Sequence, residues 1–283
     1  MQYHHNFPAF YNGKYLNINE ISISPLDRGF LFGDSIYEAI PVYAGKTLDE
    51  EGHIERLMEG LNSVGIISPY SSSAWRSLLE PLLDRQAVAQ LIYIQVSRGN
   101  ETSRKHRFPV ACEPNVLMFS NSFIPPIDLN YQGCAGHLQE DFRWQRCDIK
   151  STSLMGNVLA YQKLYRDGVA NDEALLVRDG KVVEAPSSNI FAYKNGVIYT
   201  PSLGNILGGI TRSINIKLAK DVGLNVVEEA PSCEFIKTAQ EVWVTNSMEE
   251  LKPVVSIDGE MIGDGLPGPI WRELFHAFQG LKA

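Results

Sequence analysis

The chain has 283 residues, 44% hydrophobic and 20% charged, which is enough to bury a sizeable core in one or two domains. Its formal net charge is -8 without basic runs, which argues against nucleic-acid partners. No apolar run approaches the ~18 residues of a membrane span, and the first residues lack the apolar core of a signal peptide. The four scattered cysteines suit reduced thiols in a cytoplasmic protein better than disulfides or a metal site.

The first half of the chain mixes predicted helices and strands. Apolar residues recur at helical spacing over 48–66, and a second helix is predicted over 71–88, with a kink at Pro81. Segments rich in apolar and β-branched residues predict strands at 36–43, 91–99 and 115–120, the first of them broken by Pro41. A Pro-Pro pair among polar residues marks 121–130 as a linker.

The second half continues with a predicted strand at 136–141 and a helix near 154–167. The pattern then predicts four strands within 173–200, with turn signals between them, and further on a helix over 211–223, a strand over 241–246 and a last helix near 267–279. Separate runs of strands and helices favour an α+β fold. We expect a smaller N-terminal α+β domain over 1–120, a linker over 121–130 and a larger C-terminal α+β domain over 131–283.

One lysine has an unusual setting. In the stretch FRWQRCDIKS, Lys150 follows apolar Ile149 directly and comes shortly after Arg143 and Arg146. An amine that is crowded by cations or partly desolvated becomes a nucleophile. By itself the stretch also fits a surface lysine at the end of a strand or loop.

Two further stretches suit a heteroaromatic phosphate. Glu184 follows a predicted strand, where a carboxylate can hold a protonated ring nitrogen, although it also fits a glutamate at a hairpin edge. In GGITRS (208–213), a glycine turn opens a helix near Thr211, so free N–H groups and the helix dipole would face an anion. The same pattern is also that of an ordinary helix start.

Three other positions offer polar groups for a ligand. Arg56 lies beside the apolar stripe of the helix predicted over 48–66. Its guanidinium could bind a phosphate oxygen, or it could be a surface arginine whose charged end lies in solvent. Arg104 and His106 belong to a basic loop that suits a carboxylate, or is merely solvated. Tyr37 offers a hydroxyl from a strand, or packs within it.

Together these stretches resemble the fold-type IV pyridoxal phosphate (PLP) enzymes, the class IV aminotransferases, over about residues 10–275. The resemblance implies two α+β domains joined by a short linker, PLP between them, and a homodimer as the working unit. The matching blocks are DRGFLFGDSIYE, HIERL, VSRG with RKHRFP, RWQRCDIKS, VVEAPSSNIF, ILGGITR and VWVTNSMEELKPV.

The resemblance assigns roles to individual residues. By matching position, Lys150 forms the Schiff base with PLP and moves the proton, Glu184 pairs with the pyridine nitrogen, and Arg56 binds the phosphate. Arg143 falls near the phenolic oxygen of the cofactor. Ile210, Thr211, Asn246 and Ser247 match the phosphate site, and Ser187 lies beside cofactor and substrate. Tyr37, Arg104 and His106 match the substrate-carboxylate trap of the D-amino-acid enzymes, in which the last two come from the neighbouring subunit.

The activity implied is ping-pong transamination between a D-amino acid, such as D-alanine, and a 2-oxo acid. A branched-chain L-aminotransferase and an aminodeoxychorismate lyase are the alternatives within the family. The basic loop of Arg104 and His106 favours the D-amino-acid enzyme, because a bulky apolar pocket would not suit it. A non-catalytic ligand-binding protein is disfavoured by the joint presence of Lys150, Glu184 and Arg56.

Four features depart from the family's pattern. The loop over 99–104 is one residue longer, and Pro41 replaces a longer residue on the active-site strand. Ala185 and Pro186 replace a turn rich in Gly and Ser, and Asn246 replaces a hydroxyl residue. The first two features affect the geometry in which the substrate carboxylate is bound, and the other two affect how tightly the cofactor is bound.

Overall fold

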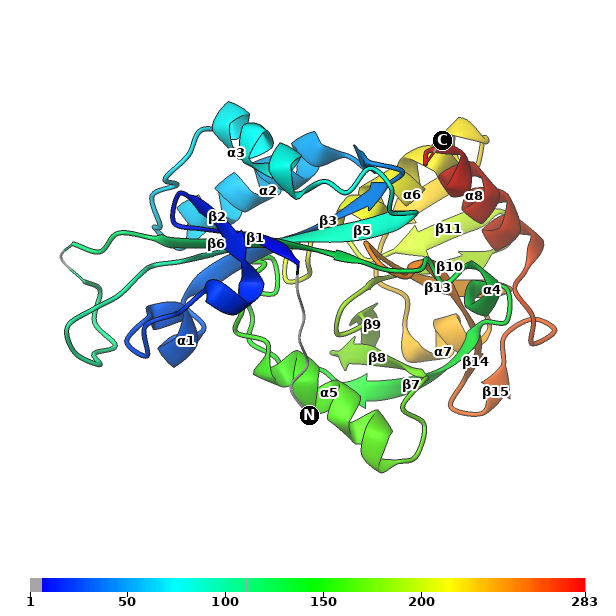
Figure 1. The fold of residues 1–283 in the computed structure, drawn as a ribbon. Coiled ribbons are helices and arrows are strands. Elements are labelled where there is room, and N and C mark those ends of the chain that lie inside the picture. The colour runs from blue at the N-terminus through cyan, green and yellow to red at the C-terminus, as the bar shows by residue number, and fades with distance from the viewer. Residues whose placement is uncertain (1–6, 110, 283) are drawn as a thin grey trace. The chain divides into compact units, whose positions relative to one another are not determined.

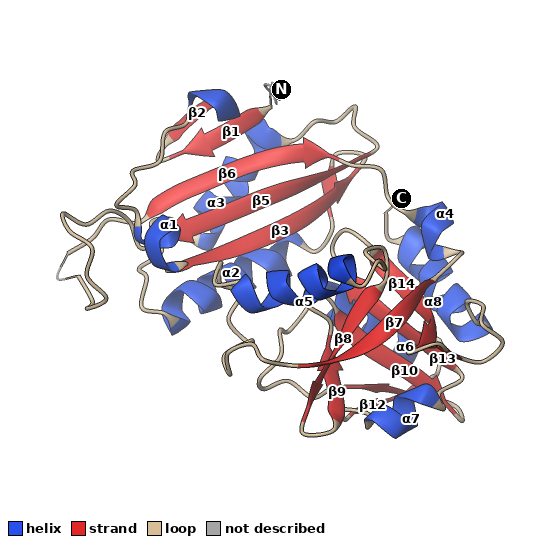
Figure 2. Cartoon of the chain, turned by 90° about the horizontal axis from the view of Figure 1, so that it is seen from below, coloured by secondary structure: helices blue, strands red, loops and turns tan. Residues whose placement is uncertain are grey.

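The computed structural model describes residues 7–109 and 111–282 (Figure 1). The chain divides into two compact units, which we call unit 1 and unit 2. Unit 1 comprises Met1–Ile124 and Ile149–Leu154, and unit 2 comprises Pro125–Asp148 and Met155–Ala283. Strands and helices are mixed in both units, as the predicted α+β class requires (Figure 2).

Unit 1 is built on an antiparallel sheet, whose described strands follow the order β2-β1-β6-β5-β3-β4. The two longest strands, β3 and β5, pair over nine residues each, so this part of the sheet is long and regular. The strands are β1 (Pro8–Tyr11), β2 (Lys14–Asn17), β3 (Ser35–Tyr43), β4 (Lys46–Thr47), β5 (Ala89–Ser97) and β6 (Asn115–Ser122).

The core of unit 1 lies between this sheet and two helices. The apolar side of α2 (Glu50–Ser63) contributes Ile54, Leu57 and Leu61, and α3 (Ser72–Leu79) contributes Trp75 and Leu79. Figure 1 shows both helices along the same face of the sheet. The remaining helices of the unit are short: α1 (Arg28–Phe32) and the 3-10 turns η1 (Ile18–Glu20) and η2 (Glu80–Leu82).

Two prolines act differently in unit 1. The helix predicted over 71–88 ends at Leu79 because Pro81 has no N–H to continue it, and the chain tightens into η2. Pro41, in contrast, does not break β3. Its carbonyl accepts from Leu48 N–H at 2.9 Å on the side away from β5, so the N–H that proline lacks would also point to that side.

Unit 2 is built on a larger mixed sheet, whose described strands follow the order β12-β11-β10-β13-β14-β7-β8-β9, with β15 beside β14. Its strands are β7 (Cys134–Glu140), β8 (Glu173–Arg178), β9 (Lys181–Glu184), β10 (Asn189–Lys194), β11 (Val197–Thr200), β12 (Asn225–Glu228), β13 (Glu241–Asn246), β14 (Glu250–Ile257) and β15 (Glu260–Met261). Its helices are α4 (Ile127–Asn130), α5 (Met155–Arg166), α6 (Ile210–Asp221), α7 (Cys233–Lys237) and α8 (Pro269–Gly280).

The four strands predicted within 173–200 are confirmed as β8 to β11. Their hairpins turn at Asp179-Gly180 and Asn195-Gly196, and all four residues have positive φ angles between 52° and 85°. Asp and Asn tolerate this region better than other side chains, and glycine adopts it freely, which explains why these dipeptides end the strands.

The segment around Lys150 is grouped with unit 1 rather than with the rest of the C-terminal half. Its backbone bonds to the start of β3, since Tyr37 N–H donates to the Lys150 carbonyl at 3.0 Å and Thr152 N–H donates to the Ser35 carbonyl at 3.0 Å. The domain boundaries predicted above, with a linker over 121–130, stay a prediction.

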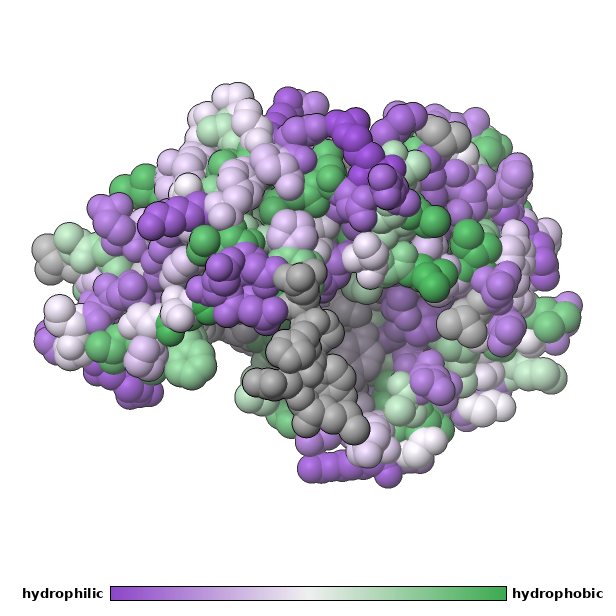
Figure 3. All heavy atoms as spheres, in the orientation of Figure 1, coloured by the Kyte–Doolittle hydropathy of each residue, from purple (hydrophilic) through white to green (hydrophobic). Residues whose placement is uncertain are grey.

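None of the helices in the described ranges combines the length and the apolar character needed to cross a membrane. The face drawn in Figure 3 has hydrophilic residues across it, with hydrophobic residues scattered among them.

Candidate active site

Lys150 is held by the main chain at the edge of β3. Ile36 and Ser151 form an antiparallel bridge, and Ile149 is buried in the core of unit 1. The half-buried Lys150 side chain extends from this anchored backbone over Tyr37, and its Nζ lies 4.1 Å from the centre of the tyrosine ring. The apolar Ile149 therefore fastens the segment, and Lys150 remains partly accessible.

Tyr37 and Glu38 are neighbours on β3 and point to opposite faces of the sheet, as alternation requires. The ring of Tyr37 stacks on Tyr93 of β5, with 5.8 Å between the ring centres. Tyr93 in turn stacks on Phe119 of β6, with 5.0 Å between the centres. This row of aromatic rings fixes the plane of Tyr37 beneath the amine of Lys150.

Arg56 projects from α2 towards Glu38 of β3. Its Nε and Nη2 lie 2.7 and 2.8 Å from the two carboxylate oxygens of Glu38, a bidentate pair. His53, one helical turn earlier, places Nδ1 2.8 Å from Glu38 Oε2. Sequence reasoning missed Glu38 and His53. The available signals were a glutamate in phase with buried Ile36 and Ile40, and the i, i+3 spacing of His53 and Arg56.

Arg104 and His106 lie in the loop after β5 and are exposed. His106 meets the ring of Phe32 edge-on at 5.3 Å, and the guanidinium of Arg104 lies 5.1 Å from the centre of the same ring. In the part of the chain that the structure describes, neither makes a hydrogen bond, ion pair or ring contact with Tyr37. The three residues of the expected carboxylate trap are thus not joined within one chain.

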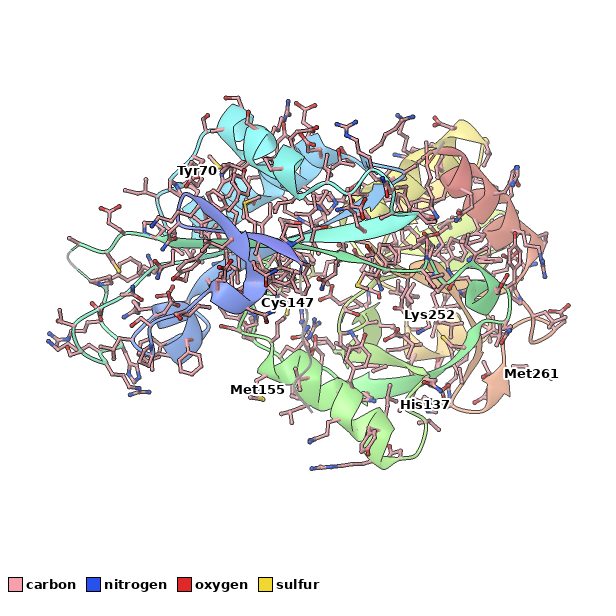
Figure 4. All side chains as sticks on the ribbon, viewed as in Figure 1. Tyr70, His137, Cys147, Met155, Lys252 and Met261 are labelled. Atoms are coloured by element: carbon pink, nitrogen blue, oxygen red, sulfur yellow. The ribbon has the colours of Figure 1, made fainter. Side chains whose placement is uncertain are left out.

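In unit 2, Arg143 lies beside two carboxylates. Its Nε is 2.9 Å from Asp141 Oδ1, and its Nη2 is 2.8 Å from Glu184 Oε1. Asp141 also receives Arg178 at 2.6 Å. The loop that carries Arg143 includes Cys147, which is labelled in Figure 4 and donates its thiol to the Trp144 carbonyl at 3.1 Å. Asp141 and Arg178 were not singled out from the sequence, because nothing local distinguishes them from surface charges.

Glu184 ends β9 with its side chain almost fully buried, at 3% exposure for the residue. Leu207 N–H donates to Oε2 at 3.2 Å, and Oε1 is ion-paired with Arg143 Nη2 at 2.8 Å, without a well-directed hydrogen bond from the described residues. Burial raises the pKa of Glu184 to about 7, although Arg143 opposes the shift. A buried carboxylate oxygen without a well-directed hydrogen bond fits a further partner that brings its own N–H, such as a protonated pyridine.

Helix α6 begins at Gly209, with Ile210 and Thr211 in its first turn and no side-chain cap. A Cβ on Gly209 would lie 2.1 Å from Asn189 Oδ1, so only glycine fits this turn. Asn189 Nδ2 donates to the Leu207 carbonyl at 2.7 Å, which holds the preceding loop. The first N–H groups of a helix have no intrahelical acceptor, so this end suits a phosphate.

Asn246 and Ser247 follow β13 in a turn. Asn246 Oδ1 accepts from Met248 N–H at 2.8 Å and from Glu249 N–H at 2.7 Å, and its Nδ2 donates to Ser188 at 2.9 Å. We therefore expect Asn246 to act through the shape of the turn rather than through its side chain.

Ser187 is exposed, and its hydroxyl lies 2.6 Å from that of Tyr161. Tyr161 also donates to buried Glu173 at 3.2 Å. Ser187 is thus oriented by α5, which carries Tyr161, while its side chain stays accessible to a ligand.

The mixed helices and strands of the chain form the fold of a fold-type IV aminotransferase. Residues 35–257 match the family "Amino-transferase class IV", and the chain belongs to that family. It is an aminotransferase of the class that uses PLP.

Curated relatives and solved structures agree with this membership. The chain is 41% identical to the D-alanine aminotransferase of Staphylococcus aureus (strain N315), over 95% of this chain and 96% of the relative. It is 37% identical to that of Bacillus licheniformis, over 96% and 95% of the two chains. A branched-chain amino acid aminotransferase of Escherichia coli has a TM-score of 0.89 at 21% identity, covering 98% of this chain and 95% of that one, so it shares the fold.

Proposed function

We propose that this enzyme is a D-amino-acid transaminase, which moves the amino group between a D-amino acid, such as D-alanine, and a 2-oxo acid. The observation that carries the proposal is the similarity to D-alanine aminotransferases over nearly the whole length of both chains, at 41% identity for the S. aureus relative. The basic loop with Arg104 and His106 supports it, because two cationic or hydrogen-bonding side chains suit the carboxylate of a small amino acid.

The family resemblance indicates which described residues would hold PLP. In unit 1, Lys150 would bind the cofactor covalently, and Arg56 would pair with its phosphate. In unit 2, Glu184 Oε1, which accepts no well-directed hydrogen bond from the described residues, would accept from the pyridine nitrogen. Arg143, beside Glu184, would face the phenolic oxygen. The start of α6, with Ile210 and Thr211, and the turn with Asn246 and Ser247 would donate to the phosphate.

When bound, PLP supplies an electron sink for the pair of electrons left when the α C–H bond of the substrate breaks. Lys150 Nζ accepts that proton and donates it again later, so the amine must be uncharged when it acts. The anchored backbone of Lys150 and the ring of Tyr37 limit the positions that Nζ can reach. Proton transfer depends on such positioning, because donor and acceptor must come within hydrogen-bonding distance.

The substrate carboxylate would be held by the hydroxyl of Tyr37 and by Arg104 and His106. Since Arg104 and His106 do not contact Tyr37 within the described part of one chain, we assign them to the site of a second copy in a homodimer. Ser187 would lie beside the substrate. Four free cysteines are in keeping with a reducing compartment, and we place the enzyme in the cytoplasm.

The half-reaction of the yellow holoenzyme tests the function. D-alanine, L-leucine and aminodeoxychorismate are added separately, and the absorbance of lysine-bound PLP is followed. We expect rapid bleaching by D-alanine and little by L-leucine. Bleaching by L-leucine instead would make the enzyme a branched-chain L-aminotransferase. Release of pyruvate and aminobenzoate from aminodeoxychorismate, without bleaching by either amino acid, would make it a lyase.

A further inference from the structure

A carboxylate is buried in the apolar core of unit 1. Glu38 lies in the middle of β3 with 0% of its surface exposed, on the face that α2 covers. The residues two positions away on the same face, Ile36 and Ile40, belong to the core. An ionised carboxylate in such a setting is costly unless its oxygens are paired. A glutamate here therefore needs an explanation beyond packing.

The side-chain partners of the carboxylate come from one side of α2, and the Ala39 N–H of β3 also donates to Oε2 at 3.3 Å. Glu38 Oε1 receives Arg56 Nε at 2.7 Å, and Oε2 receives Arg56 Nη2 at 2.8 Å. Oε2 also lies 2.8 Å from His53 Nδ1. His53 is 1% exposed, whereas the Arg56 side chain is 14% exposed. The network is thus closed at its Glu38 and His53 end and reaches the surface only through Arg56.

The charges of the network are set by these contacts. Burial would raise the pKa of Glu38, but the contacts with Arg56 and His53 outweigh burial and hold its pKa well below the usual range. Burial lowers the pKa of His53, and Glu38 opposes this only in part. A neutral His53 beside an ionised acceptor carries its proton on Nδ1 and donates it to Glu38.

A bidentate pair fixes the plane of a guanidinium, because both N–H vectors of one edge are engaged at once. In Arg56 the engaged edge is Nε and Nη2, so Nη1 is directed away from Glu38. Buried ion pairs add little net stability compared with well-packed apolar residues. What the pair adds here is a defined orientation of the arginine.

We propose that Glu38 and His53 are positioning residues, which hold Arg56 in the one orientation that binds the phosphate ester of the cofactor. The inference rests on the proposed function, which assigns Arg56 to that phosphate. Glu38 directly follows Tyr37, whose N–H binds the Lys150 carbonyl. Two consecutive residues of β3 thereby place both the arginine and the lysine segment.

The experiment compares cofactor with and without its phosphate. Apoenzyme prepared from the full-length holoenzyme is titrated with PLP and with pyridoxal, and Kd is measured for each. Glu38→Gln keeps the shape of the side chain but turns a donor towards the donors of Arg56. We expect it to weaken PLP binding about tenfold, within the usual range of coupling between bonded neighbours, and to leave pyridoxal binding unchanged.

A double-mutant cycle separates positioning from structure. If Glu38 acts through Arg56, then Glu38→Gln adds no further loss of PLP affinity in an Arg56→Ala background. Equal weakening of PLP and pyridoxal by Glu38→Gln, or full additivity with Arg56→Ala, would overturn the inference. The 31P chemical shift of bound PLP is expected to move in Glu38→Gln, and an unchanged shift would count against a change at the phosphate.

Two control variants and a second test variant complete the design. Glu51 lies on α2, as His53 and Arg56 do, and its exposed carboxylate pairs with Arg76 of α3. We expect Glu51→Gln to change neither the Kd for PLP nor the Kd for pyridoxal. Glu241→Gln loosens a buried carboxylate that caps α8, and we expect lower thermal stability with an unchanged ratio of the two Kd values. If Glu38→Gln does not fold, His53→Leu is expected to weaken PLP selectively and His53→Asn, which keeps a donor, to restore it.

Failure of the inference is distinguishable from failure of the proposed function. The function is judged by bleaching with D-alanine, which does not depend on either Kd. Arg56→Ala could leave the ratio of the PLP and pyridoxal Kd values unchanged while D-alanine still bleaches the enzyme. Arg56 would then not bind the phosphate, and the inference would be wrong. If D-alanine fails to bleach the enzyme but the cycle shows coupling, the substrate assignment is wrong and the positioning role stands.

Discussion

The backbone N–H of Tyr37 donates to the carbonyl of Lys150 at 3.0 Å, and the amine of the same lysine lies 4.1 Å from the centre of the Tyr37 ring. One strand residue thus holds the lysine at both its main chain and its side chain. The main-chain bond fixes where the side chain starts, and the ring attracts the ammonium form by a cation–π interaction. The hydroxyl of Tyr37 and its ring can be removed separately by mutation, while the main-chain bond stays in place.

Replacing Tyr37 by Phe keeps the ring and removes the hydroxyl. We expect Tyr37→Phe to raise KM for D-alanine about 10- to 100-fold, since a hydrogen bond to a charged group contributes about 1.5–3 kcal/mol. Tyr37→Leu also removes the ring that limits the positions of Lys150 Nζ, so kcat should fall as well, by several-fold, because proton transfer depends on positioning. Steady-state kinetics of both variants test this. Equal kcat in Phe and Leu variants would show that the ring does not position the lysine.

Removal of the amine itself tests the central assignment. Lys150→Ala should abolish turnover of every amino donor, a loss of at least about 10³-fold, because both covalent binding and proton transfer depend on this nitrogen. The absorbance of lysine-bound PLP should vanish too. Lys181→Ala, which removes a half-exposed lysine side chain paired with Glu229 at 3.5 Å, serves as the control. Substantial turnover by Lys150→Ala would transfer the role to another residue.

The basic loop after β5 is tested by Arg104→Ala. We expect KM for D-alanine to rise by a factor that corresponds to about 2–4 kcal/mol, the loss when one partner of a charged hydrogen-bonded pair is removed. Lys105→Ala is the matched control, because its carbonyl, which accepts from Arg28 at 2.8 Å, is left in place. An unchanged KM in Arg104→Ala would mean that the substrate carboxylate is held elsewhere.

Whether the loop serves a second copy is a separate question. Arg104→Ala and Lys150→Ala chains, each inactive or weak alone, can be mixed under conditions that exchange subunits. If Arg104 acts in the partner's site, half of the sites in a mixed dimer lack both groups and the other half lack neither, so activity towards D-alanine returns. Mixtures that stay as weak as the Arg104→Ala protein would place the loop in its own chain's site.

Glu173 gives unit 2 a pH-dependent stability. Burial raises its pKa from 4.5 to about 7, although Lys252, labelled in Figure 4 and 3.5 Å from Glu173, opposes the shift. Since the folded state binds the proton more tightly than the unfolded state, stability falls as pH rises from about 4.5 through 7. The difference between a pKa of 4.5 and one of about 7 corresponds to about 3 kcal/mol in the free energy of unfolding.

Glu173→Gln should remove this dependence. Its free energy of unfolding in urea, relative to the unmodified protein, is expected to rise by up to about 3 kcal/mol between pH 4 and pH 8. Gln keeps an oxygen that accepts from Tyr161, so the contact at 3.2 Å is retained. A difference between the two proteins that stays constant over this pH range would mean that the pKa of Glu173 is the same in the folded and unfolded states.

Local patterns predicted the regular elements of this chain well. The helix found as α2 was predictable because five apolar residues recur at helical spacing, and the hairpins after β8 and β10 because Asp-Gly and Asn-Gly favour positive φ angles. Strands such as β12 and β14 were not predicted. β12 has four residues, is largely exposed and lies at the sheet edge, and β14 contains Pro253.

Some residues of the candidate site could be predicted from the sequence and others could not. Lys150 and Glu184 stood out because their neighbours are unusual for charged side chains. Glu38 did not, because a lone glutamate in a strand is usually on the solvent face, and only the packing of α2 shows that this one is buried. Within the described residues Arg104 lies against the ring of Phe32 and not against Tyr37, so its role is inferred from family resemblance.

Glu184 is predicted to act on chemistry more than on binding. In Glu184→Gln a neutral amide replaces the buried carboxylate, so the ring nitrogen would lose its anionic partner. We expect bleaching by D-alanine to slow about 100-fold, whereas Kd for PLP should change less than about tenfold, because the phosphate and Lys150 contacts remain. α-Deuterated D-alanine should show a larger isotope effect in the variant, since proton removal becomes rate-limiting. The control is Glu241→Gln, which changes a buried carboxylate of β13 that caps α8. A variant that loses PLP affinity as much as rate would show that Glu184 serves binding rather than the electron sink.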